Sequence, residues 1–478
     1  MSAKRTLPTG VSTCRVLHLL VFSLFAVVAS SNVWAASALP WVDARDFSTF
    51  AECVNSPTSA GKTILVSTPM NVGTLTVPAD RDLRFTKGGM LVVADGKVLS
   101  IAGSFDAPLI QVFSGTGAVT MANGIVKEIY PQWWGAKGDG LHDDTEAIQR
   151  AIDARQGQTA IFFPTGNYFC SRTIHITNNR THLVGSGIYA TVFTFSPSGE
   201  EVLFDFAAPK AETTLSQCSL KNMGFLANGT TRKVAVRLVN TSLMVIEDIS
   251  IHHSWQGTGS IGILMHGREL TTIRKATISS DRPIVIEKNL SKGPESYIDC
   301  DHLHMQDLYL TSDVPSAACI FIASGVNLTN FVLDGTNAFL LAKYGLYWDD
   351  TSSRGTSNNM SIKNIRVEQK VEKNGYAVYI SHNYGLQNLI IENVSVSRFN
   401  NGFYLRKCRT VSLINCMIRS PSGEALNADD NCDDLAIINC MWQAGSKAKL
   451  AGLVEKFSIS KTWSASPLPA TGFYQRPR

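Results

Sequence analysis

From residue 218 onward, the chain repeats one pattern of apolar and polar positions. The pattern runs apolar, any, aliphatic, any, polar, apolar, any, apolar, as in CSLKNMGF, VIEDISI and LIIENVSV. We call the central polar residue the keystone. The keystones are Asn222, Asp248, Lys275, Asp307, Asn330, Asn364, Asn393, Asn415 and Asn439. They recur on average about every 27 residues, and the positions two before, one after and three after each keystone are apolar.

This double periodicity predicts a parallel β-helix. Alternation with a period of two indicates β-strands that bury one face, and a recurrence of roughly 20 to 50 residues indicates a solenoid. One coil cannot close a core alone, but stacked coils pair strand on strand and bury a continuous apolar column. The alternation breaks at the keystone, so we expect the chain to bend there, with stacked Asn side chains hydrogen-bonded from coil to coil.

The segment GDGLHDDTEAIQRAIDA, residues 138–154, predicts a short amphipathic helix. Asp144 or Thr145 is suited to the N-cap position. The apolar face of the helix consists of Ala147, Ile148, Ala151 and Ile152. A helix placed just before the first coil would cover the open apolar end of the column, which a solenoid needs for solubility. We therefore expect the acids of this segment to have mainly a structural role, rather than a role in catalysis or cation binding.

The segment WGAKGDGLHDDTEAIQRAID, followed by IFFPTGNYFCSRTI and LVGSGIYAT, resembles the N-terminal signature of the rhamnogalacturonase/epimerase-like branch of pectate-lyase-like proteins. The resemblance covers Trp133 to about Thr191, and the repeats extend it to about Ala444. Proteins of this superfamily are single-stranded right-handed β-helices and include polysaccharide lyases, glycoside hydrolases and phage tailspikes. The resemblance thus implies a right-handed parallel β-helix and a carbohydrate polymer as ligand. It does not imply one reaction, because the scaffold hosts elimination, hydrolysis, epimerisation and plain binding.

These patterns divide the 478 residues into four parts. We expect a secretory signal peptide at 1–35, because basic residues precede the apolar run VLHLLVFSLFAVVA and small residues follow it. An uncleaved membrane anchor is the alternative, which the shortness of the apolar run disfavours. Residues 36–129 are predicted to form a small β-rich module, and residues 130–456 the all-β right-handed parallel β-helix, with its capping helix at about 144–155. Residues 457–478 are expected to form a loosely ordered tail.

Charge and cellular location limit the partners. The formal net charge of +4 falls to +1 without residues 1–35, so nothing indicates a nucleic-acid partner. We expect a secreted protein, extracellular or periplasmic, with no stable membrane insertion after the signal peptide is cleaved. The oligomeric state is not indicated by the sequence.

The ten cysteines form neither CxxC motifs nor Cys/His metal spacings. Cys416 and Cys440 occupy the same inward register on adjacent coils, and Cys408 and Cys432 share an earlier register. Each pair could be packed thiols or a disulfide. We favour thiols for the first pair, and both alternatives stay open for the second.

Aligning the coils by GILMHG, IVIEK, IFIAS, LYWDD, VYISH, FYLRK and ALNAD predicts an edge rich in ionisable groups. The residues just past each strand would stack as His266, Glu287, Ala323, Asp349, Ser381, Arg406 and Ala428. A second column beside it would hold Gly267, Lys288, Ser324, Asp350, His382, Lys407 and Asp429. Two coils are longer than the others, with 32 residues between Lys275 and Asp307 and 34 between Asn330 and Asn364. Long loops on one face of a solenoid often form its binding site.

Glu287 and Asp349 are the candidate catalytic acids of a glycoside hydrolase. They lie two rungs apart, so their backbones are roughly 9 to 10 Å apart. Side-chain orientation could bring their carboxyls into the roughly 6.5 to 9.5 Å range of an inverting glycosidase. One acid would then donate a proton and the other would activate water. The alternative is a surface ion pair, because Lys288 follows Glu287.

His382, Arg406 and Lys407 are the candidate catalytic residues of a lyase, with Asp350 and Asp429 nearby. A lyase needs a base to remove the proton beside a uronate carboxylate and cations to stabilise the enolate. The alternative is a solvated ladder of charges. A lyase could use calcium, for which we find no convincing site, and no other cofactor is predicted. The lack of GHG and RIK triplets disfavours a polygalacturonase.

Aromatic residues near the same edge, Tyr347, Trp348, Tyr379, Tyr384 and Tyr404, could stack on sugar rings, although alternation turns some of them inward. Together these patterns predict a secreted carbohydrate-active enzyme, a lyase or a glycoside hydrolase, that cleaves a complex, acidic polysaccharide. The alternative is a non-catalytic glycan-binding or surface-structural β-helix. Convergence of the candidate residues in one concave site would favour the enzyme, and a shallow row of aromatic and amide side chains would favour the binder.

Overall fold

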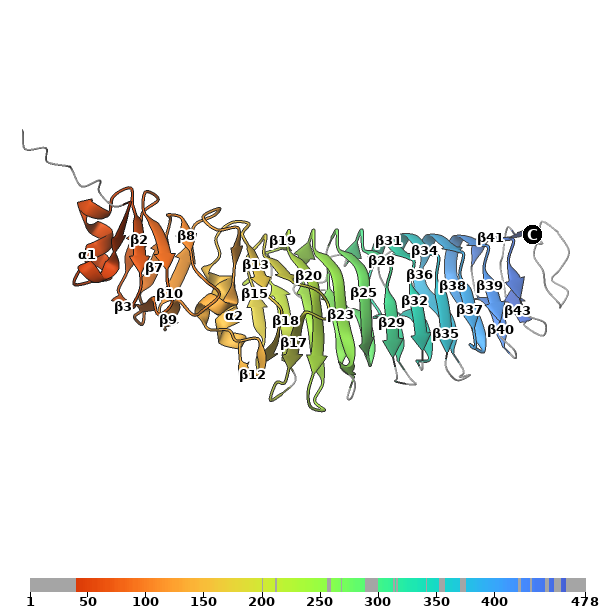
Figure 1. The fold of residues 1–478 in the computed structure, drawn as a ribbon. Helices are drawn as coiled ribbons and strands as arrows, with labels where there is room; N and C mark the ends of the chain where they lie inside the picture. The colour runs from red at the N-terminus through yellow and green to blue at the C-terminus, as the bar shows by residue number, and fades with distance from the viewer. Residues whose placement is uncertain are drawn as a thin grey trace, which may run out of the picture. The chain divides into compact units, whose positions relative to one another are not determined.

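The computed structural model describes residues 40–199, 201–210, 213–255, 259–267, 269–288, 300–312, 314, 317–340, 342–351, 357–369, 375–419, 423–429, 432–442, 447–450 and 457–460. Parallel strands dominate this part of the chain, and its α-helices are α1 (Phe50–Asn55) and α2 (Thr145–Ala154). Figure 1 shows the strands arranged as successive coils, and the predicted parallel β-helix is confirmed.

Residues 41–121 form a small stack of coils with three parallel sheets. The first sheet is β1 (Trp41–Asp43), β2 (Thr63–Val66), β5 (Asp82–Phe85) and β8 (Phe105–Asp106). The second is β3 (Pro69–Val72), β6 (Met90–Val93) and β9 (Phe113–Gly115), and the third is β4 (Leu75–Val77), β7 (Val98–Ile101) and β10 (Ala118–Met121). Helix α1 lies at the N-terminal end of this stack and buries Phe50 and Cys53 (Figure 1).

The following coils build three columns of parallel strands. The first column is β15 (Ile174–Ile176), β18 (Glu201–Ala207), β21 (Lys233–Val239), β24 (Ile261–His266), β26 (Arg282–Ile286), β30 (Ala318–Ile322), β33 (Tyr344–Asp350), β36 (Tyr376–Glu392), β38 (Asn401–Ile414), β40 (Glu424–Asp429) and β43 (Lys447–Leu450). Its outward face carries the candidate site described below.

The second and third columns complete each coil. The second is β11 (Glu128–Ile129), β13 (Ala160–Phe163), β16 (His182–Gly185), β20 (Ser219–Ala227), β23 (Val245–Trp255), β25 (Thr272–Ser280), β28 (His304–Gln306), β31 (Leu328–Asp334), β34 (Ser357–Lys363), β36, β38, β41 (Asp433–Ile438) and β44 (Phe457–Ser460). The third is β12 (Asp139–Asp143), β14 (Gly166–Cys170), β17 (Thr191–Phe195), β20, β23, β25, β29 (Tyr309–Ser312), β32 (Asn337–Leu340), β35 (Arg366–Gln369), β37 (Ser395–Ser397), β39 (Met417–Arg419) and β42 (Met441–Trp442). The short strands β19 (Leu215–Ser216), β22 (Thr241–Ser242) and β27 (Cys300–Asp301) lie beside these columns.

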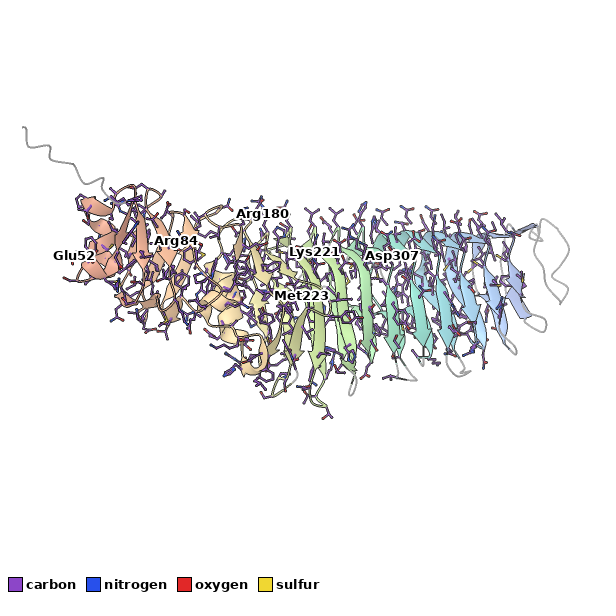
Figure 2. All side chains as sticks on the ribbon, in the orientation of Figure 1. Glu52, Arg84, Arg180, Lys221, Met223 and Asp307 are labelled. Atoms are coloured by element: carbon purple, nitrogen blue, oxygen red, sulfur yellow. The ribbon has the colours of Figure 1, made fainter. Side chains whose placement is uncertain are left out.

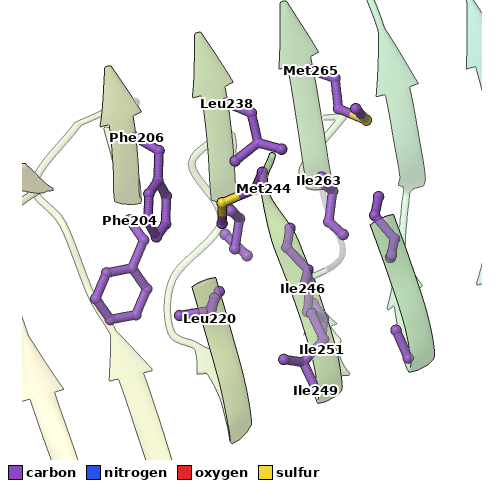
Figure 3. Packing of buried hydrophobic residues seen from close by; sticks show 14 of the residues in the cluster. Phe204, Phe206, Leu220, Leu238, Met244, Ile246, Ile249, Ile251, Ile263 and Met265 are labelled. Atoms are coloured by element: carbon purple, nitrogen blue, oxygen red, sulfur yellow. The ribbon is translucent and has the colours of Figure 1, made fainter. Parts of the chain in front are cut away.

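The core is a column of stacked apolar side chains inside the coils. Figure 3 shows Leu238, Ile263 and Met265, from the first strand column, pointing into the same interior as Leu220 and Ile246 from the second. In-register stacking places like residues above one another on successive rungs, because parallel strands lie roughly 4.8 Å apart. Each buried side chain of this kind contributes about 1.5–3 kcal/mol relative to an exposed one, so the repeated apolar pattern is what holds the coils together.

The predicted bend at the keystones is confirmed. All nine predicted keystones have φ between 50° and 58°, in the left-handed region that favours Gly, Asn and Asp. The Nδ2 of Asn393 donates to Oδ1 of Asn364 at 3.0 Å, and the Nδ2 of Asn439 donates to Oδ1 of Asn415 at 2.8 Å. The amide ladder therefore satisfies polar groups between coils, as expected.

The assignment of Asn330 as a keystone in the same ladder is wrong. Asn359, and not Asn364, lies beside Asn330, because the Nδ2 of Asn359 donates to Oδ1 of Asn330 at 3.0 Å. The keystone of that coil is Gly335, which has φ 64° and donates its N–H to the carbonyl of Lys363 at 3.1 Å. The coil that ends at Asn364 is therefore shorter than expected, and only one of the two predicted long coils remains.

This error has a physical cause. Each coil bends twice in left-handed conformations five residues apart, for example at Asn359 and Asn364 or at Asn388 and Asn393. Apolar residues flank both bends, so the pattern fits either one. Gly335 adopts the left-handed conformation without a polar side chain. It therefore did not match the repeat pattern, which requires a polar residue at the keystone.

Helix α2 begins after its N-cap Asp144 and buries the predicted apolar face. The Asp144 carboxylate accepts hydrogen bonds from the backbone N–H groups of Lys137 at 2.6 Å and Gly138 at 3.0 Å. This confirms a structural role for that acid. The helix does not cover an open end, contrary to our expectation, because its buried residues share one core with β10 (Figure 1) and the N-terminal coils before it.

The C-terminal boundary also differs from the prediction. Phe457–Ser460, expected in the tail, forms β44 and pairs with β41, so strands continue past residue 456. Residues 461–478 and the expected signal peptide lie outside the described residues. No helix in the described part of the chain has the length and apolarity needed to span a bilayer. The nine described cysteines are buried thiols, including the in-register Cys416 and Cys440.

Candidate functional site

Four stacked aromatic rings run along the outward face of β30, β33, β36 and β38. They are Phe321, Tyr347, Tyr379 and Tyr404, which occupy the same register on successive strands. The ring centroids are 5.8 Å apart between Phe321 and Tyr347, 5.0 Å between Tyr347 and Tyr379, and 4.4 Å between Tyr379 and Tyr404. The interplanar angles are 11°, 18° and 6°. We call these four residues the tyrosine ladder.

Further aromatic and basic side chains flank the ladder. Tyr344 and Tyr376 lie three residues before Tyr347 and Tyr379 and pack their rings at 4.6 and 5.8 Å from them. The Arg282 guanidinium lies 5.6 Å from the ring centroid of Phe321 and covers the N-terminal face of the ladder. The result is a half-buried aromatic surface with cations at its margin.

The ladder does not offer ring faces to a sugar, which corrects one expectation. Nearly parallel neighbours cover both faces of Tyr347 and Tyr379, so these rings present their edges and hydroxyl groups outward. Trp348 is buried, and the side chain of Tyr384 lies outside the described residues. Burial, with the charge of Asp349, raises the pKa of Tyr347 to about 12, so its phenol stays protonated at neutral pH. Three of the four rings, those of Tyr347, Tyr379 and Tyr404, thus carry hydroxyls that can hydrogen-bond.

Most residues of the predicted ionisable edge stack in the expected register. The backbone pairs Asp349 with Ser381 and Ser381 with Arg406, as expected. The last coil was misaligned by one residue, because Arg406 pairs with Asp429 and not with Ala428. The segment ALNAD alternates too weakly to fix its own phase, so the error is one of register. The side chain of Asp429 lies outside the described residues.

Glu287 and Asp349 both remain accessible beside the ladder. The Glu287 side chain is 38% exposed, and its Oε2 lies 3.8 Å from Nε2 of His266. Oδ2 of Asp349 accepts a hydrogen bond from the Tyr347 hydroxyl at 3.3 Å. The two acids lie on β33 and just past the end of β26, two strand spacings apart along the first column, which is roughly 9 to 10 Å of backbone separation.

Asp350 and His382 form a buried pair, and both side chains are 0% exposed. Oδ2 of Asp350 lies 3.3 Å from Nε2 of His382. Nδ1 of His382 accepts the backbone N–H of Gly385 at 3.0 Å, so the ring proton is assigned to Nε2, facing Asp350. Oδ1 of Asp350 accepts the N–H of Gly325 at 2.9 Å. Both side chains are therefore enclosed by the protein.

Burial lowers the pKa of His382. The negative charge of Asp350 raises this pKa, and the positive charge of Lys407 lowers it further, so the net shift is downward. A neutral, enclosed imidazole cannot take a proton from a polymer on the surface. The predicted lyase group therefore does not converge, because His382 faces inward while Nζ of Lys407 donates to the backbone carbonyl of Asn383 at 3.1 Å. Arg406 remains on the outward face, two strands from Asp349.

The sequence search missed four members of this surface, namely Phe321, Tyr344, Tyr376 and Glu424. The hydroxyl of Tyr376 donates to Oε2 of Glu424 at 3.1 Å. A usable signal was present, because the spacing YGLY recurs as YAVY on the next coil. The long loops expected to flank the site are residues 289–302 and 349–359, and of these 289–299 and 352–356 lie outside the described residues. Among the described residues, no three His, Cys, Asp or Glu side chains cluster as metal ligands.

Comparison with known proteins confirms the resemblance seen near the N-terminal signature. Residues 133–206 match the family described as rhamnogalacturonase A/epimerase, pectate lyase-like. The chain is 37% identical over 78 residues to alginate lyase 7 of Azotobacter vinelandii, a match that covers 15% of this chain and 9% of the relative. It is 27% identical over 197 residues to plasmin and fibronectin-binding protein A of Streptococcus pneumoniae, covering 34% of this chain and 27% of the relative.

The matched segments span between 9% and 27% of the length of the curated relatives. A solved structure, the catalytic unit of a GH87 alpha-1,3-glucanase from Streptomyces thermodiastaticus, is similar with a TM-score of 0.49 and 13% identity. That similarity covers 72% of this chain and 70% of the glucanase chain. The relatives thus include an alginate lyase, a capsule-specific depolymerase and a protein named for plasmin and fibronectin binding.

Proposed function

We propose that this protein binds a complex, acidic polysaccharide outside the cell, along the outward face of β26, β30, β33, β36 and β38, and hydrolyses it there. The observation that carries this proposal is the tyrosine ladder, whose Tyr347, Tyr379 and Tyr404 place a hydroxyl on each of three successive rungs beginning at that of Asp349. A polymer of sugars repeats its own hydroxyls along its length, so a surface that repeats hydrogen-bonding hydroxyls in the same direction suits it.

The charges around the ladder favour an acidic polymer. Arg282 lies over the ring of Phe321, and Nζ of Lys343 lies 5.1 Å from the ring centroid of Tyr344. Arg406 is on the outward face beyond Asp349. These cations can pair with uronate carboxylates. The phenols of Tyr347 and Tyr376 donate to Asp349 and Glu424, so their oxygens can accept hydrogen bonds from sugar hydroxyls.

Hydrolysis fits the geometry better than elimination. Glu287 and Asp349 are both accessible, and two strand spacings separate them by roughly 9 to 10 Å at the backbone, near the carboxyl spacing of roughly 6.5–9.5 Å in inverting glycosidases. One carboxyl would protonate the glycosidic oxygen and the other would activate water on the opposite side of the sugar. Elimination would need an accessible base, and the base predicted for it, His382, is enclosed.

A second candidate function is glycan binding without cleavage. The aromatic residues of the site form a row, which is sufficient for adhesion and requires no catalytic group. The similarity to a protein named for plasmin and fibronectin binding is consistent with a role in attachment. In this case Glu287 and Asp349 would be surface acids only.

The decisive experiment incubates the full chain with a panel of acidic and neutral polysaccharides while binding, new reducing ends and absorbance near 235 nm are measured. We expect reducing ends without unsaturated product on at least one acidic polymer. Unsaturated product would contradict hydrolysis. Binding to a polymer without new reducing ends would support the glycan-binding alternative.

Matched variants connect the activity to the site. Asp349→Asn and Glu287→Gln should each lower the rate of cleavage at least 100-fold, because a removed acid or base contributes about 10²–10⁴-fold. Glu392→Gln is the control, because Glu392 is a surface acid that pairs with Lys363 on another face. If the control loses as much activity as the site variants, the assignment is wrong.

A further inference from the structure

A pocket lies far along the chain from the tyrosine ladder, at the corner of the first large coils. It has a volume of about 610 Å³ and is lined by residues after α2, by the loop before β16 and by β19 with the residue after it. The side chains used below are Arg155, Asn178, Asn179, Arg180 and Gln217. Pockets for small molecules typically have volumes of about 300–1,000 Å³, so one or two sugar units would fit.

Arg155 forms the floor of this pocket and is only 5% exposed. Its Nη2 donates to the carbonyl of Asn179 at 3.1 Å and to the hydroxyl of Thr181 at 2.8 Å, and its Nη1 donates to the carbonyls of Gly157 and Arg180. These acceptors are all neutral. They hold the guanidinium in place and tie it to the pocket walls, but they do not neutralise its charge.

One donor of the Arg155 guanidinium has no acceptor among the described residues. Nε of Arg155 is buried and has no hydrogen-bond partner in the described part of the chain, where Arg155 also forms no ion pair. A buried cation without a counter-charge is costly, and an unsatisfied buried donor costs about 1–3 kcal/mol. An anion in the pocket would balance the charge of the guanidinium through space, without contacting the enclosed Nε.

The walls have the same character as the floor. Arg180 sits at a left-handed corner with φ 58°, and its Nε donates to Oε1 of Gln217 at 2.7 Å. This bond fixes the guanidinium at the rim, which Figure 2 places at the margin of the coils. The lining holds two arginines and several amides but no carboxylate. Arginine binds carboxylates through paired hydrogen bonds, and amides suit sugar hydroxyls.

We infer that this pocket binds a hexuronate unit of an acidic saccharide, with its carboxylate on the guanidinium of Arg180, near the positive charge of Arg155, and its hydroxyls on the amides of Asn178, Asn179 and Gln217. The choice of an acidic sugar rests on the proposed function, whereas the pocket and its positive floor do not. The site would hold one end or one segment of a polymer while the ladder holds another, and bivalent attachment of this kind raises overall affinity.

The test measures binding of glucuronate to the full chain by calorimetry, with glucose and acetate as separate probes. We expect glucuronate to bind at least 10-fold more tightly than either probe, because only glucuronate carries both the carboxylate and the hydroxyls. Equal affinity for acetate would overturn the assignment to a sugar, and equal affinity for glucose would overturn the role of the arginines.

Arg180→Asn is the diagnostic variant, because Asn tolerates the left-handed corner and should leave folding intact. We expect it to weaken glucuronate binding at least 10-fold with an unchanged unfolding temperature. Arg398→Asn is the matched control, since Arg398 is an exposed arginine with φ 60° near Glu368. Unchanged binding in Arg180→Asn would overturn the proposal.

Tyr379→Ala separates this inference from the proposed function. The substitution should reduce polymer binding at the ladder and leave glucuronate binding to the pocket within 2-fold of wild type. If the ladder binds no polymer but Arg180 still controls glucuronate binding, the proposed function fails and the pocket stands. If the change at Tyr379 abolishes glucuronate binding, the pocket assignment fails.

Discussion

Asp349 and Asp350 are adjacent in the chain but lie in two different regions of the molecule. Asp349 lies on the outward face of β33, where its carboxylate accepts a hydrogen bond from Tyr347 beside the tyrosine ladder. Asp350 turns inward and meets His382, and both of those side chains are 0% exposed. One aspartate therefore faces the outer surface and its neighbour faces the interior. The direction of the side chain decides which role each has.

The largest effect is expected from breaking the buried region. Asp350→Ala would leave His382 and the N–H of Gly325 without their carboxylate partner. Leaving a buried donor without its acceptor costs about 1–3 kcal/mol, and two donors lose theirs here. We therefore expect the free energy of unfolding, measured by chemical denaturation, to fall by about 2–6 kcal/mol. A loss below about 1 kcal/mol would contradict the pairing described here.

A smaller effect is expected from breaking the ladder. Tyr379→Ala removes two stacked ring pairs, each worth about 0.5–1.5 kcal/mol, so stability should fall by about 1–3 kcal/mol. Tyr379→Phe keeps the stack and removes only the hydroxyl group. It should leave stability nearly unchanged while weakening polysaccharide binding. If Tyr379→Phe binds the polymer as well as the wild type does, the hydroxyl row is not the binding element.

The buried region should also respond to pH, whereas the ladder should not near neutrality. The pKa of His382 is lowered by burial, so this residue binds a proton more readily in the unfolded state than in the folded state. Stability should therefore fall as the pH decreases below about 6.5, by at most about 1.4 kcal/mol per pH unit. The variant His382→Gln keeps a donor toward Asp350 but does not titrate. Denaturation curves between pH 5 and 8 should show a shallower slope for the variant, and identical slopes would refute the assignment.

The smallest effect on stability is expected at the outward acid. Asp349→Asn keeps the shape of the side chain and its contact with Tyr347, so the free energy of unfolding should change by no more than about 0.5 kcal/mol. The same substitution should nearly abolish cleavage, as proposed above. Comparing its denaturation midpoint with that of Asp350→Ala tests directly whether Asp350 is needed for stability and Asp349 for activity.

The candidate site was partly predictable. The alignment of Glu287 with Asp349, and of Asp349 with Arg406, followed from counting strands, because parallel in-register coils place equivalent positions above one another. The inward rotation of His382 was not foreseen, because it lies just past the alternating part of its strand, where the period of two no longer applies. The tyrosine stack was foreseen only as scattered rings, since stacking depends on side-chain angles that register alone does not fix.

The sequence by itself determined that this protein is a parallel β-helix, because the apolar alternation and the left-handed keystones recur in nearly every coil. Errors arose where the sequence allowed two registers, as at Asn330 and Asp429. Only the tertiary structure decided which polar residues face solvent and which face one another. Burial and pairing depend on contacts between coils more than 20 residues apart in the sequence, and no local pattern encodes the direction in which a side chain leaves the end of a strand.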